Sequence, residues 1–290
     1  MTATTTAPAP AAAPAGRRPR RRARPATGVL LAVPALLLAA VAALAPSTIA
    51  RYDPTAMDFA AALQGPSWAH WLGTDESGRD LYSRIVHGTL PALSIGLGAA
   101  ALAIVSALVL GTAAALGGRV LGGVVAWVIE ILFSFPTLLL ALLLVAVLGP
   151  SAAVSAVAIG VGSAPGYARI VRGQVLSARG SGYVEAATVL GHARARILAR
   201  HVLPNAVRPL VGIFTLAVAQ SVVWASGLAF LGLGVAPPSS EWGALLDAGR
   251  PYITTAPWLT LVPGLVITLL ALAVTTAGRH LQRFVEKEGS

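Results

Sequence analysis

Residues 88–116 read GTLPALSIGLGAAALAIVSALVLGTAAAL, a run that contains no charged side chain. A helix needs roughly 20 apolar residues to cross the hydrocarbon core of a bilayer. Backbone polar groups cannot stay unpaired in lipid, and the run is continuously apolar instead of alternating, so a β-barrel strand is excluded. The run therefore predicts a transmembrane helix.

Five further apolar runs follow the same logic, and they cover residues 28–50, 122–148, 152–171, 207–232 and 257–279. The composition agrees, because the chain is 56% apolar and 11% charged, whereas soluble domains carry about 25% charged residues. Gly, Ala and Ser inside the runs allow helices to pack closely in lipid. The sequence thus predicts an all-α integral membrane protein with six transmembrane helices.

The distribution of Lys and Arg predicts the orientation of these helices. With the N-terminus inside the cell, 17 of the 21 basic residues fall on inner segments. The four on outer segments are Arg51, Arg79, Arg84 and Arg250. Because cytoplasmic segments carry the excess of positive charge, we expect both termini to lie inside.

Domain boundaries follow from these spans. We expect a disordered Arg/Pro/Ala-rich cytoplasmic tail over 1–27, an extracytoplasmic loop over 51–87, a core transmembrane domain over 88–280 and a cytoplasmic tail over 281–290. The Arg cluster in the first tail is typical of a nucleic-acid arm, but its position beside an apolar run favours contact with anionic lipid. The first run also resembles a signal peptide, although its length favours an uncleaved helix.

Few residues are suited to chemistry of their own. The chain has no Cys, and its single Lys, Lys287, precedes Glu288, so it contains no G-x-x-x-x-G-K-[ST] nucleotide motif. We predict no cofactor, no metal site and no catalytic set. Glu130 is the one ionisable residue well inside a predicted span, and such groups are functional candidates. The alternative is a Glu near the cytoplasmic interface, paired with Arg119 or Arg169.

The largest inner loop, residues 177–209, has the pattern of a helix–turn–helix. Ser181 can cap a short helix that begins at Gly182. Gly191 stands where a helix-terminating residue is expected. The second helix should end at Leu203-Pro204, because the residue before Pro avoids helical backbone angles.

The first of these helices has an apolar face whose residues recur at a spacing of three to four. A helix of this kind docks into a groove on another protein or lies on lipid. The residues of the face are Tyr183, Ala186, Ala187 and Leu190.

The same loop carries a spaced motif. Glu185-Ala186-Ala187 is followed after three residues by Gly191, and after nine more by His201-Val202-Leu203-Pro204. This resembles the EAA loop of ABC-importer permeases, E-A-A-x3-G-x9-I-x-L-P, with His201 in place of Ile. The extension to Asn205 is similar to the variant found in the peptide and nickel branch.

Other runs between about 70 and 245 match the same branch in the same order. They are LGTDESGRD at 72–80, EILFSFP at 130–136, FLGLG at 230–234 and EWG at 241–243. The chain is therefore similar to the C-type permease subunit of dipeptide, oligopeptide and nickel ABC importers, and the resemblance implies a type I importer permease fold.

The resemblance also implies two sets of functional residues. The set expected to couple to an ATPase is Tyr183, Glu185, Ala186, Ala187, Leu190, Gly191, Leu203 and Pro204. The set of extracytoplasmic motif residues is Gly73, Thr74, Asp75, Gly78, Arg79, Asp80, Glu241, Trp242 and Gly243.

The resemblance further implies partners and a function. A homologous second permease, two ATPase subunits, an extracytoplasmic substrate-binding protein and the lipid bilayer are expected, and nucleic acid is not. The chain would form half of a path for di- or oligopeptides in the plasma membrane of a prokaryote, while ATP is hydrolysed elsewhere. The alternative cargo is nickel or a metallophore complex. A stand-alone secondary transporter would need an ion-coupling site and often inverted repeats, and neither is evident.

Overall fold

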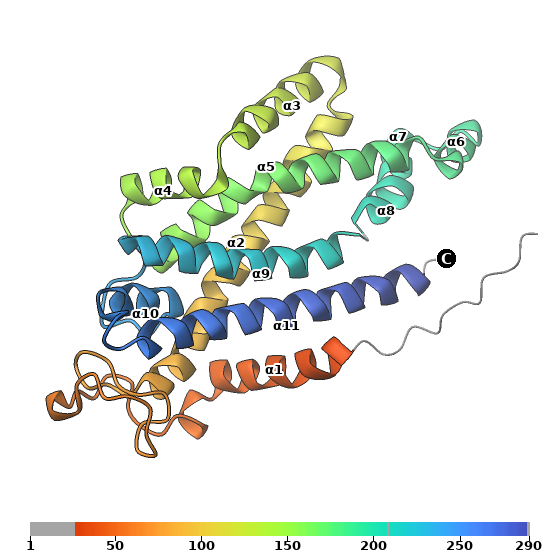
Figure 1. Cartoon of the computed structure of the whole chain (residues 1–290). Coiled ribbons are helices and arrows are strands. Elements are labelled where there is room, and N and C mark those ends of the chain that lie inside the picture. Colours follow the sequence, from red (N-terminus) through yellow and green to blue (C-terminus); the bar gives the residue numbers. More distant parts are fainter. Residues whose placement is uncertain (1–26, 208, 289–290) are drawn as a thin grey trace, which may run out of the picture.

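The computed structural model describes residues 27–207 and 209–288, and this part of the chain is built from helices joined by turns and loops (Figure 1). Its only β-type pairing is an isolated bridge between Thr74 and Asp80. The predicted all-α class is confirmed. The tail predicted over 1–27 lies outside the described residues, except for Thr27. The five longest helices are α2 (Leu81–Leu116), α11 (Trp258–Glu288), α5 (Ala152–Arg179), α9 (Leu210–Leu228) and α1 (Thr27–Leu44).

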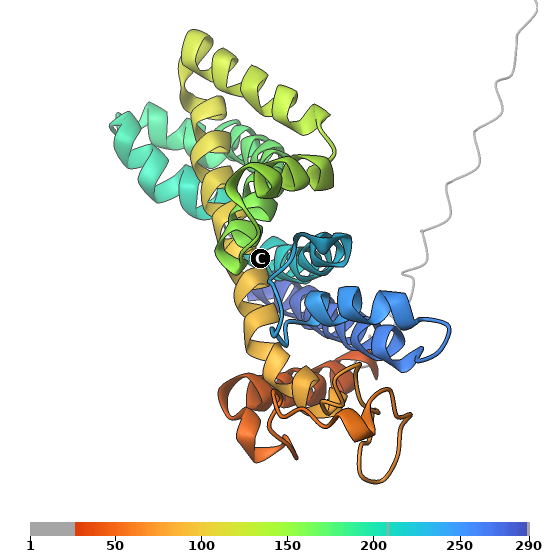
Figure 2. The same ribbon diagram turned by 90° about the vertical axis from the view of Figure 1, so that its left-hand side faces the viewer.

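Four of these helices lie side by side in the order α1, α11, α9 and α5, and α2 crosses them at a steep angle (Figures 1 and 2). The 36 residues of α2 span about 54 Å at 1.5 Å a residue. That length exceeds the roughly 30 Å core of a bilayer. One inclined helix therefore contacts α1, α9 and α5.

Small side chains let α2 lie close to its neighbours. Ala99, Ala100, Ala103 and Ala107 are fully buried. At Gly111 a Cβ would stand only 2.6 Å from the backbone oxygen of Ala168 on α5. Close backbone approach is how apolar helices gain packing energy in lipid, where the hydrophobic effect between them is absent.

The run predicted as a single span over 122–148 is divided into two helices, α3 (Gly118–Ser134) and α4 (Thr137–Leu148). Their axes are bent by 89°. Pro136 causes the break, because the residue before a proline avoids helical angles, and Phe135 is extended with φ −84° and ψ 133°. The prediction of one continuous helix is wrong here, although a broken span still has the required length.

Four helices of the described chain are long and apolar enough to cross a membrane, or five if the bent α3–α4 pair is one span. They are α2, α5, α9 with its π-helical extension, and α11. The apolar part of α1, Gly28–Leu44, is shorter than the length used for this count. The number six and the orientation in the membrane stay predictions.

Several helix ends differ from the predicted boundaries. α1 ends at Leu44, ahead of Pro46, and not at residue 50. α2 begins at Leu81, within the predicted loop 51–87, because Asp80 caps its first turn by accepting from the backbone N–H of Ser83. At the other end, residues 281–288 continue α11 where a separate tail was predicted.

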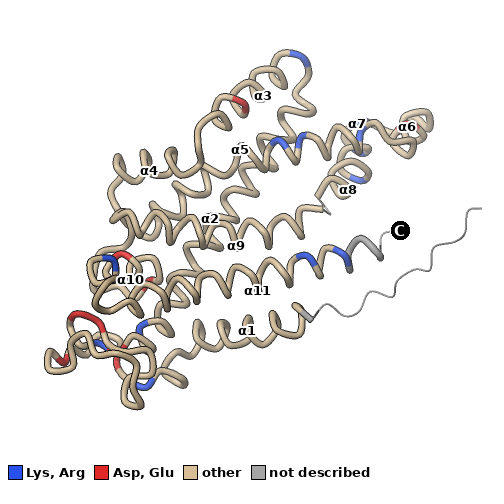
Figure 3. The backbone as a smooth tube through the Cα atoms, viewed as in Figure 1, with Lys and Arg blue, Asp and Glu red and all other residues tan. Residues whose placement is uncertain are grey.

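Charged residues divide between the two ends of the bundle (Figure 3). Acidic positions gather in the loop before α2 and near α10 (Trp242–Gly249), which lie at one end, and several Arg positions lie among them. The opposite end, with α6 (Gly182–Val189), α7 (Arg194–Ile197) and the end of α11, carries mostly Arg positions. This separation along the helix axes is the pattern on which the predicted orientation depends.

Candidate functional site

The helix α6 projects from the end of the bundle, beyond the ends of α5 and α9 (Figure 1). It begins at Gly182 as predicted, but Ser181 makes no side-chain cap, and its hydroxyl donates instead to the carbonyl of Ala178. Val184 and Ala187 are buried in the same apolar cluster as Ala168 and Val175 of α5. Hence the inner face of α6 is fixed against the permease itself.

The outer face of α6 carries apolar side chains without cover. Tyr183 is 44% exposed and Leu190 is 74% exposed, and Ala186 lies exposed between them. Ala187 does not share this face, since it is 4% exposed and packs inward. The predicted grouping of all four on one face is therefore wrong for Ala187, because consecutive residues such as Ala186 and Ala187 lie about 100° apart around a helix, and here the helix packs on the Ala187 side.

Glu185 lies in the first turn of α6 and is exposed. It takes part in no ion pair among residues 27–207 and 209–288. A carboxylate in the first turn is favoured by the helix dipole. The position therefore presents a fixed negative charge beside the exposed apolar face.

Gly191 ends α6 as predicted, with φ of +75°. The N–H of Gly191 donates to the carbonyl of Thr188, and the N–H of His192 donates to the carbonyl of Ala187. These two bonds form a Schellman motif, which satisfies carbonyls that the helix end leaves free. A Cβ at Gly191 would meet no atom within 4 Å, so only the left-handed backbone favours glycine here.

The second helix of the loop does not end at Leu203-Pro204. It continues from α7 through a π-helical turn, Leu198–Val202, into α8 (Leu203–Val207). Pro204 has no N–H, and a π turn just before it relieves the ring clash with the preceding turn. The side-chain amide of Asn205 donates to the carbonyl of His201 at 2.7 Å. The predicted stop is therefore wrong, since the wider turn accommodates the proline.

The family-motif residues near 75 form a buried ionic cluster at the opposite end of the bundle. One carboxylate oxygen of Asp75, Oδ2, accepts from Nε of Arg79 at 2.7 Å and from a terminal nitrogen of Arg84. The other oxygen accepts from the backbone N–H of Ser77 and of Arg79. Arg79 also pairs with Glu76 at 2.8 Å. Asp75, Arg79 and Arg84 are each at most 5% exposed.

Two turns hold this cluster in shape. Gly73 and Gly78 have φ of +81° and +75°, which side chains with a Cβ rarely adopt. Thr74 is fully buried, and its hydroxyl donates to the carbonyl of Ala61. Asp80 accepts from the hydroxyl of Ser83 at 2.7 Å and contacts His70 Nδ1 at 2.9 Å. The predicted residues are thus internal supports of the loop.

The cluster is tied to the segment before α10, more than 150 residues later in the chain. Arg84 donates to the carbonyl of Ser239 at 2.8 Å. Trp242, 2% exposed, donates from its indole to the carbonyl of Ile85 at 2.9 Å. The structure therefore unites the two predicted extracytoplasmic motifs in one unit.

Glu241 caps α10, with its two oxygens accepting from the N–H groups of Gly243 and Ala244 at 2.9 Å each. Burial raises the pKa of the Glu241 carboxyl above its ordinary value, although the two hydrogen bonds act in the opposite direction. Gly243 lies against Ala229, where a Cβ would stand 2.6 Å from the Ala229 methyl group. All three residues of this motif therefore serve helix capping and packing.

Sequence reasoning missed the contributions of Ser239 and Trp258. The Trp258 indole donates to the carbonyl of Thr74 at 3.3 Å. Arg84 was noted as an outer basic residue and, with Ser83, as the continuation of the LGTDESGRD match, but no partner was predicted for it. The charged LGTDESGRD run signalled a structured loop, but nothing in its order indicated the distant acceptor at Ser239.

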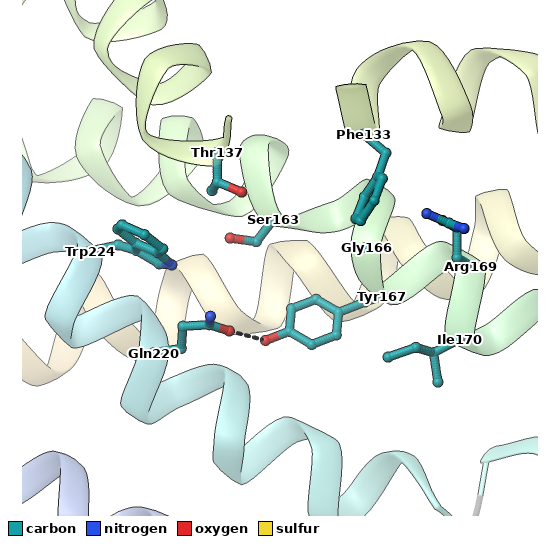
Figure 4. Close-up of a pocket in the computed structure, with 9 residues that line it drawn as sticks. All are labelled: Phe133, Thr137, Ser163, Gly166, Tyr167, Arg169, Ile170, Gln220 and Trp224. Carbon is teal, nitrogen blue, oxygen red and sulfur yellow. Dashed lines mark hydrogen bonds between the residues drawn. The ribbon is translucent and has the colours of Figure 1, made fainter. Parts of the chain in front are cut away.

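Glu130 pairs with Arg169, one of the two partners predicted for it. The Arg169 Nε lies 3.4 Å from Glu130 Oε1, and the side chains are 47% and 51% exposed. Arg169 also lies over the ring of Phe133, at 4.5 Å. Beside this pair is a pocket of about 460 Å³ between α3, α4, α5 and α9 (Figure 4).

Residues 107–287 match the protein family described as "Binding-protein-dependent transport system inner membrane component". The match covers more than half of the chain and includes α5, α6 and α9. The chain belongs to this family. It is thus an ABC-importer permease subunit, as the EAA-type loop predicted, and ATP hydrolysis resides on separate subunits.

Named relatives are similar over most of the chain. The dipeptide transport system permease protein DppC of Alkalihalophilus pseudofirmus is 38% identical over 76% of this chain and 72% of the relative. The di/tripeptide permease protein DppC of Pseudomonas aeruginosa is 37% identical over 85% of this chain and 84% of its own length. The glutathione permease protein GsiD of Pectobacterium atrosepticum is 35% identical over 91% and 87%.

Solved structures support the fold. A permease chain of the MetNI methionine ABC transporter, in an inward-facing conformation, aligns with a TM-score of 0.58 at 20% identity. The alignment covers 71% of this chain and 97% of that chain. An amino acid ABC transporter aligns with a TM-score of 0.56 over 70% of this chain and 94% of its own. The permease fold expected from the sequence is confirmed.

Proposed function

We propose that this permease forms half of the transmembrane path of an ATP-driven importer of short peptides, and that α6 is the element that couples it to an ATPase subunit. The single observation that carries the coupling role is the two-sided burial of α6. Its inner face is fixed by Val184 and Ala187, while its outer face leaves Tyr183 and Leu190 uncovered. A force applied to that outer face would reach α7 and the π-helical turn Leu198–Val202, which α6 contacts, and through their shared apolar cluster α5.

The outer face of α6 has the chemistry of a docking surface. Its apolar side chains provide area to bury, and helix-in-groove recognition uses this kind of spacing. Glu185 supplies a charge for a basic partner. Ala186 is small, which permits close approach. Leu203 and Pro204 stay assigned to the same surface through their place in the motif, since Pro204 is exposed beside the π-helical turn.

The names of the relatives support a peptide as the cargo. Dipeptide, di/tripeptide and glutathione carriers share about a third of their residues with this chain over most of its length. The remaining components would be a homologous second permease, two ATPase subunits and an extracytoplasmic binding protein. The location would be the plasma membrane of a prokaryote, in line with the bacterial sources of these relatives.

The coupling role is tested by substituting the end of α6. Gly191→Val forces a β-branched residue into the left-handed region, at a cost of about 1–2 kcal/mol, and should misplace the exposed face. We expect less ATPase subunit to co-purify with this variant, and substrate-stimulated hydrolysis to fall together with uptake. Glu185→Lys should weaken the same contact by reversing its charge.

Two matched controls separate coupling from folding. Gly191→Asn keeps a residue that tolerates left-handed angles, and its Cβ has open space, so it should behave nearly as the wild type. Gly173→Val places the same bulk on α5, where a Cβ also meets nothing within 4 Å. Normal co-purification and hydrolysis for both Gly191→Val and Glu185→Lys would refute the coupling role.

The importer function is tested with the full complex in liposomes. With ATP inside and binding protein outside, tri-alanine should accumulate, and depletion of ATP should abolish the uptake. Uptake that persists without ATPase subunits and follows an ion gradient would instead identify a secondary transporter.

A further inference from the structure

The pocket beside Glu130 and Arg169 is lined by polar and aromatic side chains of otherwise apolar helices. Tyr167 and Ser163 of α5 and Gln220 and Trp224 of α9 surround one end, and Phe133 and Arg169 lie at the other (Figure 4). The Tyr167 hydroxyl donates to the Gln220 side-chain oxygen at 3.0 Å. The volume of about 460 Å³ is within the range of small-molecule sites, about 300–1,000 Å³.

The polar side chains that line the pocket indicate that it does not face lipid. Arg169 belongs to a helix that is long and apolar enough to cross the membrane, and it is 47% exposed. An ionised side chain that faced hydrocarbon would be costly, so such groups face cavities, water or other protein segments. Tyr167 and Gln220 both line the pocket and point toward each other (Figure 4).

Arg169 is only partly used by its own chain. Its contact with Glu130 is long, at 3.4 Å, and involves Nε. A guanidinium has five N–H donors, and no other ion pair or hydrogen bond of Arg169 occurs within the described ranges 27–207 and 209–288. Its two terminal nitrogens are therefore available to a second acceptor.

We propose that Arg169 binds the terminal carboxylate of a peptide in transit, an inference that rests on the proposed peptide-import function. The planar fork of a guanidinium matches a carboxylate with two parallel hydrogen bonds. The Tyr167 hydroxyl donates its proton to Gln220, so its oxygen offers an acceptor to the peptide backbone, and the Gln220 amide nitrogen offers a donor. Phe133 and Trp224 provide apolar contact for side chains of varied shape.

Glu130 keeps the affinity of the Arg169 site for the peptide low. Its carboxylate competes with the peptide carboxylate for the same guanidinium, so that the peptide can leave. Passage through a membrane path requires binding that permits entry without preventing exit. Arg169 is thus a specificity residue, and Glu130 positions and partly neutralises it.

The test compares tri-alanine with tri-alanine amide, which lacks the terminal carboxylate. Uptake is measured in liposomes that contain the complete complex purified through this chain, with its binding protein. Arg169→Gln should lower the initial rate for tri-alanine about tenfold, the loss expected when one charged hydrogen-bonding partner is removed. The rate for the amide should change less than about twofold relative to its own wild-type value.

For each probe, the rate of the variant is divided by the rate of the wild type. This ratio cancels any preference of the binding protein for the free acid over the amide. Arg169→Lys should retain part of the tri-alanine rate, because a positive charge persists. Arg119→Gln is the matched control, since it makes the same change at an exposed position of α3 outside the pocket. It should leave both rates unchanged.

Three results would overturn the proposal, and each would identify a different premise as wrong. Equal changes for the two probes in Arg169→Gln would show that the carboxylate is not read here. Loss of the second permease from the purified complex in the same variant would identify the pocket as a subunit interface. Absence of ATP-dependent uptake of either probe by the wild type would refute the peptide-import function itself, and the inference with it.

Discussion

Asp75 is the central residue of the ionic cluster at the end of the bundle that carries α10. Its carboxylate pairs with both Arg79 and Arg84, and all three residues are almost fully buried. Burying charges is costly, but removing one partner of a buried group is worse, because the others stay charged and unpaired. The cluster also includes backbone N–H donors, so that a single carboxylate organises both a turn and a helix.

We therefore predict a large effect from a nearly isosteric change. Asp75→Asn removes the negative charge while Arg79 and Arg84 remain buried, and should lower the free energy of unfolding by about 3–5 kcal/mol. Thermal denaturation of the purified subunit in detergent measures the loss. Asp247→Asn is the control, since its 4.0 Å pair with Arg250 is exposed and should be worth at most about 1 kcal/mol. Equal effects of the two changes would contradict this account.

Glu130 provides the opposite case. Its pair with Arg169 is half exposed, so removing it should cost only about 0–1 kcal/mol. We expect Glu130→Gln to lower the melting temperature slightly and to reduce ATP-driven uptake of tri-alanine without abolishing it, because Arg169 keeps its charge but loses the carboxylate that competes with the peptide. Uptake and assembly are measured together. Complete loss of uptake in a normally assembled complex would mean that Glu130 acts directly in the path.

At the scale of elements, the crossing of α2 and α5 is the central contact of the bundle. Small residues bring the two backbones together, and the fit differs along the crossing. A Cβ at Gly111 would lie 2.6 Å from the Ala168 backbone oxygen, whereas one at Gly98 would lie 3.6 Å from the Ala156 Cβ. The first distance is too short for any side chain and the second is ordinary contact.

The same substitution should thus have different results at these two positions. Gly111→Ala must push α2 from α5, at a cost of about 1–3 kcal/mol, as in other overpacked sites. Gly98→Ala should be neutral or stabilising, because alanine favours a helix more than glycine does. Melting temperatures of the two variants in the same detergent provide the comparison. A similar loss for both would mean that helix propensity and not backbone approach limits this contact.

At the scale of the whole molecule, the charge at each end of the bundle agrees with the role proposed for the elements at that end. The Arg-rich end with α6 and α7 lies opposite the acidic end with the Asp75 cluster and α10 (Figure 3). If the Arg-rich end is cytoplasmic, α6 faces the ATPase subunits and the ionic cluster faces the binding protein. The orientation is consequently a requirement of the proposed mechanism and can be measured alone.

The chain contains no Cys, which permits labelling at single introduced sites. Thr74 is fully buried, so an outer probe belongs at Ala69, which is exposed, and an inner probe at Ala195, also exposed. On intact cells an impermeant thiol reagent should label Ala69→Cys and not Ala195→Cys. Permeabilised cells, in which both should react, control for reactivity. The reverse pattern on intact cells would invert the topology.

Local features of this protein were determined by the sequence itself. The continuous apolar runs predicted helices because lipid leaves the backbone no other partner. Gly191 was predicted at the end of α6 because a left-handed residue is needed there, and φ is +75°. The motif around Glu185 indicated the family because its residues are neighbours along one short loop and can be recognised without the fold.

Contacts between distant segments were decided by the tertiary structure alone. Arg84 and Ser239 are 155 positions apart, and no local pattern determines which carbonyl a buried guanidinium meets. Ala187 was assigned to the outer face of α6, but its inward position depends on the packing of α5. Pro136 breaks a helix, whereas Pro204 is accommodated by a π turn. A proline disfavours a continuing helix at both positions, so the proline itself does not decide between the two outcomes.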